Sequence, residues 1–162
     1  MTPGQSALGA LEASGLAHAM REWLWLYPIV EIVHIFGLAI LVGSIAMFDL
    51  RVLGVAKTLP VRAVARFLLP WTLGSLVLVV PTGLSMFITH ASDFIGNPAF
   101  VTKIVLLLIV GTNAALFHVG VFRGAAAWDT GVRAPVIARL QAVLSLALWI
   151  SVISCGRLIA YL

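Results

Sequence analysis

Four long apolar stretches alternate with short polar segments along the chain. They cover residues 23–48, 67–89, 100–122 and 138–162. Each is long enough to cross the roughly 30 Å hydrocarbon layer of a bilayer as a helix. Because short connections favour antiparallel neighbours, the pattern predicts one all-α domain, an integral membrane up-down four-helix bundle. Small residues within these stretches are expected to let the helices approach closely: Gly37, Gly43, Gly74, Gly83 and Gly111.

Local signals add detail to this pattern. Asn97 and Pro98 combine an N-cap side chain with proline at the first helical position, so they predict the start of the third helix. Pro81 lies inside the second stretch and predicts a kink, which membrane helices tolerate. Residues 1–21 lack the basic start and apolar run of a signal peptide. They predict either a short helix on the membrane surface or a frayed tail.

Composition agrees with a membrane protein and excludes several other classes. Of the 162 residues, 62% are hydrophobic and only 10% are charged, too few to cover the surface of a soluble domain. The net charge of +4 is spread over loops rather than gathered on one face, so it does not predict binding to nucleic acid. The single cysteine, Cys155, excludes an intrachain disulfide framework.

The distribution of basic residues predicts the orientation in the membrane. Those in the connections between the first two stretches and between the last two, counting the first residues of the fourth stretch, are Arg51, Lys57, Arg62, Arg66, Arg123, Arg133 and Arg139. The positive-inside rule places these two loops in the cytoplasm and both termini in the periplasm. The expected location is a bacterial inner membrane, crossed several times.

Titratable side chains inside the spans are the candidates for chemistry, because a charge in hydrocarbon is costly without a partner or a role. His34 lies well inside the first span and shares a helical face with Glu31, so we interpret it as a ligand or a proton-handling group. Glu31 and Arg157 lie at similar depth and predict a structural ion pair between the first and fourth spans.

Depth divides the candidates into two layers. His34, Met86, Cys155 and Arg157 are expected near the periplasmic surface, with His90 above them. The residues Asp49, Arg51 and His118 lie toward the cytoplasm, with Asn113 near the middle. His34 and His118 should differ in depth by roughly 10–15 Å at about 1.5 Å per residue, which is a large separation for two ligands of one metal centre.

Several enzyme signatures are missing from the chain. It contains no Cys-x-x-Cys, no His-Glu-x-x-His, no phosphate-binding glycine loop and no nucleophile elbow. The chain is also too short for the paired repeats of most secondary transporters, although a homodimer would restore such symmetry. If the protein is an enzyme, oxidoreductase is the class we expect.

The segment EIVHIFGLAILVGSIAMFDLRVLG, residues 31–54, resembles the first helix of a superfamily of small membrane haem proteins. That superfamily includes the copper-resistance D membrane domain and the HemJ-type protoporphyrinogen oxidases. His34, Gly43 and Arg51 occupy the places of its intramembrane histidine, its small residue and its cytoplasmic arginine. Leu41 stands where HemJ-type proteins carry a tryptophan, so the resemblance does not extend to porphyrinogen oxidation.

Two further segments carry the same resemblance. In the third span, Lys103 and Asn113 match, and Pro81-Thr82-Gly83 is similar to a threonine-glycine pair in the intervening helix. The chain also resembles a bacterial family of four-span membrane proteins whose pattern includes Asp49-Leu50-Arg51 and Asn97-Pro98. The resemblance implies a b-type haem with His34 as an axial ligand.

From these observations we expect a haem-b protein of membrane electron transfer, working with a quinone or a periplasmic redox protein. The second iron ligand would come from His90, Met86 or His118, and Arg157 or Lys103 would pair with the haem propionates. The alternative is copper handling, because His34, His90, Met86 and Cys155 form a soft ligand set near the periplasm. A third hypothesis is an accessory membrane subunit without a cofactor.

Overall fold

The computed structural model describes the backbone of residues 3–161 and the side chains of residues 7–161. Its long helices are α3 (Leu26–Leu53), α4 (Val61–Thr89), α6 (Pro98–Val119) and α7 (Val136–Leu158). Shorter helical elements are α1 (Pro3–Glu12), α2 (Gly15–Glu22), α5 (Ala91–Gly96) and the 3₁₀ helix η1 (Val121–Trp128). All four long helices are long and apolar enough to span a membrane. The prediction of an all-α, four-span membrane bundle is therefore confirmed.

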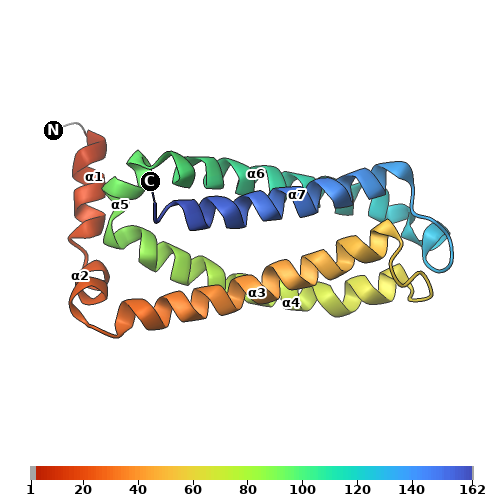
Figure 1. Cartoon of the computed structure of the whole chain (residues 1–162), viewed down its shortest axis with the longest axis horizontal. Coiled ribbons are helices and arrows are strands. Elements are labelled where there is room, and N and C mark those ends of the chain that lie inside the picture. Colours follow the sequence, from red (N-terminus) through yellow and green to blue (C-terminus); the bar gives the residue numbers. More distant parts are fainter. Residues whose placement is uncertain (1–2, 162) are drawn as a thin grey trace.

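The long helices form two hairpins. Helix α3 packs against α4, α6 packs against α7, and contacts between α3 and α7 join the hairpins. Among the described residues, no Cα of α4 lies within 8 Å of a Cα of α6 or α7. The hairpins diverge toward the end that carries α1, α2 and α5 (Figure 1). We call this end the capped end, and the opposite end, with residues 54–60 and 120–135, the loop end.

The helix boundaries differ from the limits of the apolar stretches. Helix α3 runs past residue 48 to Leu53, and α4 begins at Val61 rather than near residue 67. The backbone hydrogen bonds of a helix do not depend on whether its side chains are apolar. Each helix therefore continues into the polar residues that adjoin its apolar run. Helix α3 ends where Gly54 adopts a left-handed conformation, with φ 110°, and donates its N–H to the Arg51 carbonyl. Helix α4 continues through Pro70 and Pro81.

Close helix packing depends on fewer glycines than the sequence predicts. A Cβ on Gly37 would lie 2.8 Å from Cγ2 of Val79, so this glycine permits the close approach of α3 and α4. Gly83 likewise contacts a side chain of α3. Added Cβ atoms at the other three predicted positions would meet nothing within 4 Å, so the prediction is wrong there: Gly43, Gly74 and Gly111. These three glycines do not bring neighbouring helices together.

Apolar side chains cover the outer faces of the bundle as well as its centre. A central cluster contains Leu41 of α3, Val110 of α6 and Trp149 of α7. Large apolar side chains also point outward, and Phe36 and Val77 are 62% and 72% exposed. Exposure on this scale would be unfavourable in water, whereas lipid solvates these faces.

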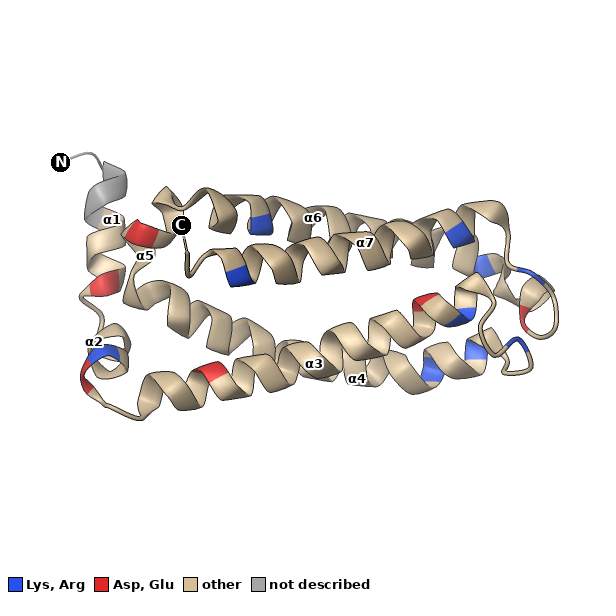
Figure 2. Ribbon diagram, in the orientation of Figure 1, with Lys and Arg blue, Asp and Glu red and all other residues tan. Residues whose placement is uncertain are grey.

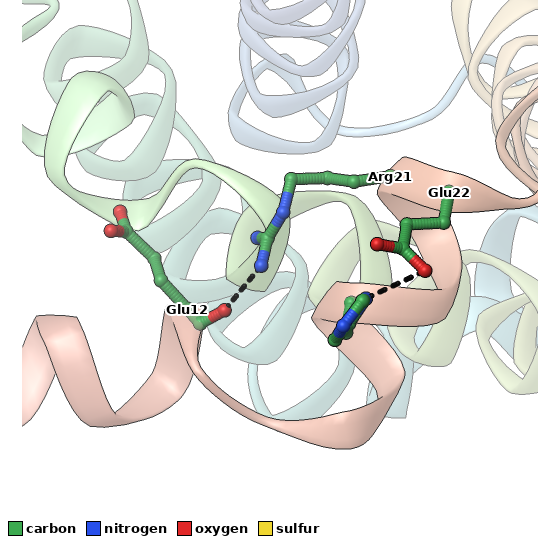
Figure 3. A network of polar contacts seen from close by, with 4 residues as sticks. Glu12, Arg21 and Glu22 are labelled. Atoms are coloured by element: carbon green, nitrogen blue, oxygen red, sulfur yellow. Dashed lines mark hydrogen bonds and ion pairs between the residues drawn. The ribbon is translucent and has the colours of Figure 1, made fainter.

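At the capped end, hydrogen bonds attach the N-terminal helices to the bundle. Arg21 of α2 donates to the carbonyl oxygen of Glu12 at 2.7 Å (Figure 3) and to that of Thr89 at 2.9 Å. The Glu12 carboxylate accepts from the backbone N–H of Ser92 at 2.8 Å and from its hydroxyl. These bonds to Ser92 lower the pKa of Glu12 below its ordinary value. The first 21 residues are thus helical over most of their described part and are not a frayed tail.

The predicted start of the third span is confirmed. Helix α6 begins at Pro98, and the Asn97 side chain accepts hydrogen bonds from the N–H groups of Ala99 and Phe100. The Asn97 side-chain amide also donates to the carbonyl of Ile159, at 3.3 Å. Asn97 therefore both caps α6 and links it to the end of α7.

Candidate functional site

His34 of α3 is hydrogen-bonded to α4 in the half of the bundle nearer the capped end. Its Nδ1 lies 2.9 Å from Oγ1 of Thr82, and the imidazole is partly buried. The Thr82 hydroxyl lies within hydrogen-bonding distance of the Leu78 carbonyl, one turn earlier on α4, and donates to it. Because a hydroxyl has a single hydrogen, Oγ1 can only accept from His34.

This pairing selects one tautomer of the neutral imidazole. With Nδ1 as the donor to Thr82, the hydrogen of neutral His34 is on Nδ1 and the lone pair is on Nε2. A histidine whose Nδ1–H is held by an oxygen acceptor, leaving Nε2 able to bind, is the arrangement that orients metal-ligating histidines. His34 therefore has the chemistry of a ligand.

Gly83 gives the imidazole ring its place against α4. A Cβ at this position would lie 3.1 Å from Cε1 and 3.7 Å from Nδ1 of His34. The first distance is tighter than ordinary van der Waals contact, so any larger residue would push the ring away from α4. Thr82 and Gly83 thus fix the hydrogen bond and the position of the ring, respectively.

The other hairpin contributes a cation to this region. Lys103 of α6 is partly buried and lies within electrostatic range of both His34 and Cys155. A Cβ on Gly156 of α7 would lie 3.9 Å from Nζ of Lys103. We call these residues the His34 site: His34, Thr82 and Gly83 of the first hairpin, which are in contact, and Lys103 and Cys155 of the second hairpin, which lie at longer range.

Two of the other predicted ligands lie between His34 and the capped end. Met86 follows Thr82 by one turn of α4 and is partly buried. His90 ends α4, is exposed and lies within electrostatic range of Glu12 of α1. The two residues therefore continue the α4 side of the His34 site toward the membrane surface.

His118 lies at the opposite end of the bundle. It is in the last turn of α6, where its Nδ1 is 2.8 Å from the Ala114 carbonyl. Its ring packs against Phe117 and Phe122 with centroid distances of 5.5 and 5.4 Å. The structure thus separates His118 from His34, as the difference in depth predicts.

The predicted ion pair between Glu31 and Arg157 is wrong. Arg157 donates to the Tyr161 hydroxyl at 2.6 Å, with its guanidinium 4.9 Å from the centre of the Tyr161 ring. Glu31 is exposed on α3. Within residues 7–161 the structure has a single ion pair, between His18 and Glu22 on α2, at 3.2 Å. Equal depth does not bring two side chains together when they lie on different faces of their helices.

The remaining candidates lie away from the His34 site. The buried Asn113 of α6 donates to the Gln141 carbonyl of α7 at 3.1 Å, and so links the helices of the second hairpin. Asp49 is 6% exposed, lies near Ser145 of α7, and its Oδ2 has no hydrogen-bond partner among the described residues. Buried Arg51 donates to backbone carbonyls of the loop end.

Thr82 and Gly83 were absent from the candidate ligands and binding residues derived from the sequence. Two signals were available: the Pro81-Thr82-Gly83 segment carries part of the resemblance, and Thr82 lies with Thr89 and other polar residues on one face, a polar stripe, of the second span. Such a stripe shows that α4 presents polar groups to another helix, but it does not identify His34 as the partner. Within the described side chains, no three His, Cys, Asp or Glu residues gather as a metal-binding group.

Comparisons with known proteins place the chain in a family. A family model described as a family of unknown function, DUF6644, matches residues 12–162. No curated protein and no solved structure matches the chain. The matched segment includes all four spans and the whole His34 site. This chain, with its four candidate membrane helices, belongs to DUF6644.

Proposed function

We propose that this protein binds haem b in the membrane through Nε2 of His34 and transfers electrons. The observation that carries the proposal is the hydrogen bond from His34 Nδ1 to Thr82 Oγ1, which leaves the Nε2 lone pair for iron. The resemblance of residues 31–54 to small membrane haem proteins supports the same assignment. A quinone or a periplasmic redox protein is the partner that fits such a role.

The composition of the His34 site fits haem better than copper. Haem supplies four nitrogen ligands of its own, so the protein needs to provide only one or two. A copper site made of protein side chains needs a larger set, and among the described residues no three His, Cys, Asp or Glu side chains lie together as a metal-binding group, so a copper site here would have to include a methionine such as Met86. Met86 and His90 are the second-ligand candidates on the His34 side of the bundle.

Each residue of the site would have a distinct role toward the haem. Haem supplies reversible one-electron chemistry at its iron. His34 would hold the iron, and Thr82 would keep the imidazole in the correct tautomer and orientation. The Lys103 ammonium would pair with a haem propionate and offset its charge in an apolar setting. Arg157 is paired with Tyr161 at the helix end and would need to turn inward to do the same.

The test of this proposal is the visible absorption spectrum of the full-length protein, purified in mild detergent from cells supplied with haem precursors. We expect a Soret band and about one haem per chain by pyridine haemochrome assay. A protein that takes up no haem, even when haemin is added after purification, would contradict the proposal. Copper found by elemental analysis of such a colourless protein would support the copper alternative, and the lack of both would leave the accessory-subunit hypothesis.

We also propose that the loop end faces the cytoplasm and that the membrane is a bacterial inner membrane. Lys and Arg gather at the loop end, whereas acidic residues predominate on the short helices of the capped end (Figure 2). This asymmetry supports cytoplasmic loops under the positive-inside rule. The His34 site would then lie near the periplasm.

The orientation predicts the outcome of reporter fusions. Alkaline phosphatase, which is active only in the periplasm, should be inactive when fused after Lys57 and active when fused after Asp93. A cytoplasmic fluorescent reporter at the same two positions should give the reverse pattern. Activity of the phosphatase at Lys57 and inactivity at Asp93 would invert the orientation, and equal signals at both would contradict the crossing of α4.

A further inference from the structure

A cavity of about 240 Å³ at the loop end is surrounded by basic side chains. Its lining includes Arg51 of α3, Arg139 of α7, and Lys57 and Arg133 of the two loops. No Asp or Glu of the described residues lines it. A single water needs only about 10–15 Å³ of cavity volume, so this cavity has room for a polyatomic ion or a lipid headgroup together with its waters.

The cations that line the cavity are not neutralised by acidic residues. Within the described side chains, neither Lys57, Arg133 nor Arg139 forms an ion pair. The nearby carboxylate of Asp129 instead accepts the backbone N–H of Arg62, at 2.8 Å. The Nε of Arg139 is buried and has no hydrogen-bond partner among the described residues, although a buried guanidinium donor normally has one.

Two further features favour a negatively charged occupant. Helix α7 begins at Val136 next to the cavity, and no described side chain caps its first N–H groups, so its positive end adds to the field. Lys57 folds back over the end of α3, where a Cβ on Gly54 would lie 2.9 Å from Cε of Lys57. Lys57 is therefore placed with its ammonium beside the cavity that it lines.

We propose that the loop-end cavity binds a phosphate group carried by an anionic molecule. Phosphate offers several acceptor oxygens and can bond to donors from different directions, whereas a carboxylate offers two oxygens in one plane. The cavity lies at the end of the membrane spans, where basic pockets between helices bind the headgroups of acidic phospholipids. The same chemistry would bind a soluble phosphorylated molecule. The proposal does not depend on haem binding.

The experiment uses the full-length protein in neutral detergent, with phosphatidylglycerol and phosphatidylcholine of identical chains as probes. Native mass spectrometry should show phosphatidylglycerol retained about ten-fold more tightly, a difference worth about 1.4 kcal/mol. The Lys57→Ala/Arg133→Ala variant should lose this preference, because it removes two exposed cavity cations without touching a helix interior. The Arg62→Ala/Arg66→Ala variant removes the same charge from exposed positions of α4 outside the cavity and should keep the preference.

A second arm separates the two sources of phosphate. Inorganic phosphate, exchanged for chloride at constant ionic strength, should leave lipid retention and thermal stability unchanged if the occupant is a lipid headgroup. Displacement of the lipid, or a rise in melting temperature that the Lys57→Ala/Arg133→Ala variant lacks, would identify a soluble phosphorylated molecule. Equal retention of both lipids together with no effect of phosphate would overturn the proposal, as would equal losses in the cavity and control variants.

Discussion

Replacing His34 with alanine should remove the Soret band of the purified protein and leave its far-ultraviolet circular dichroism unchanged. The imidazole is the only group of the His34 site that combines an oriented lone pair with a position inside a span. Its loss removes the iron ligand, whereas the helix itself tolerates alanine well. Absorption spectra of the wild type and the variant, at equal protein concentration and after reconstitution with haemin, measure the effect.

His118→Ala is the matched control for this experiment. The substitution is the same and lies in another span, but the ring is at the loop end against Phe117 and Phe122. It should leave the Soret band in place. A spectrum lost in His118→Ala and kept in His34→Ala would reverse the assignment of the ligand. Of Met86→Leu and His90→Ala, the one that shifts the band identifies the second ligand.

A variant that keeps the iron ligand tests the hydrogen bond between His34 and Thr82. Thr82→Val preserves the shape of the side chain but removes the oxygen that accepts from Nδ1 of His34. Loss of such a second partner typically lowers affinity by about 10–100-fold, so haem should be retained more weakly without loss of the iron ligand. With valine at position 82, the threonine oxygen that holds the hydrogen of neutral His34 on Nδ1 would also be absent. Haem affinity equal to that of the wild type, measured by haemin titration, would show that the bond to Thr82 does not orient the ligand.

The number and type of the helices follow from the sequence because hydrocarbon imposes one strong constraint. Every backbone polar group in lipid must be satisfied within its own segment, so a long apolar run becomes a helix. The start of α6 is equally predictable from the sequence, because Asn97 caps the helix by local hydrogen bonds. The positions of the other helix ends are harder to predict from the sequence. The end of α3 depends on the left-handed conformation of Gly54, and the start of α4 on the bond from the Val61 N–H to the Asp129 carbonyl; hydropathy describes neither.

The site was only partly predictable for a related reason. His34 stands out in the sequence because an imidazole within an apolar span is costly without a role. Its contact with Thr82 and Gly83 depends on the register and rotation of α4 against α3, which depth alone leaves open. The rotation of each helix about its axis is also why the ion pair predicted between Glu31 and Arg157 is wrong. Arg157 bonds to Tyr161 of its own segment rather than to Glu31. The depth of a residue follows from its position along a span, whereas the direction of its side chain depends on how the helices pack.

The second large effect is expected at the loop end, where Arg51 holds two loops together. The residue is 4% exposed, and its guanidinium donates from Nε to the Leu59 carbonyl at 2.7 Å. One Nη donates to the Asp129 carbonyl at 2.8 Å. The backbone of Asp129 also accepts the N–H of Val61 at 2.8 Å, so the first residue of α4 depends on the same loop. Arg51 thus joins the α3–α4 hairpin to the segment between α6 and α7.

Arg51→Met should therefore lower the free energy of unfolding by about 2–5 kcal/mol, because carbonyls at the buried guanidinium lose donors that no side chain replaces. Methionine keeps most of the side-chain volume, so the loss reports the hydrogen bonds rather than a cavity. Arg66→Met is the control, since it removes the same charge from an exposed position of α4 and should change stability by less than about 0.5 kcal/mol. Unfolding in mixed detergent and dodecyl sulfate micelles, followed by circular dichroism, measures both. Equal losses in the two variants would mean that charge at the loop end stabilises the fold and that the bonds to Leu59 and Asp129 do not.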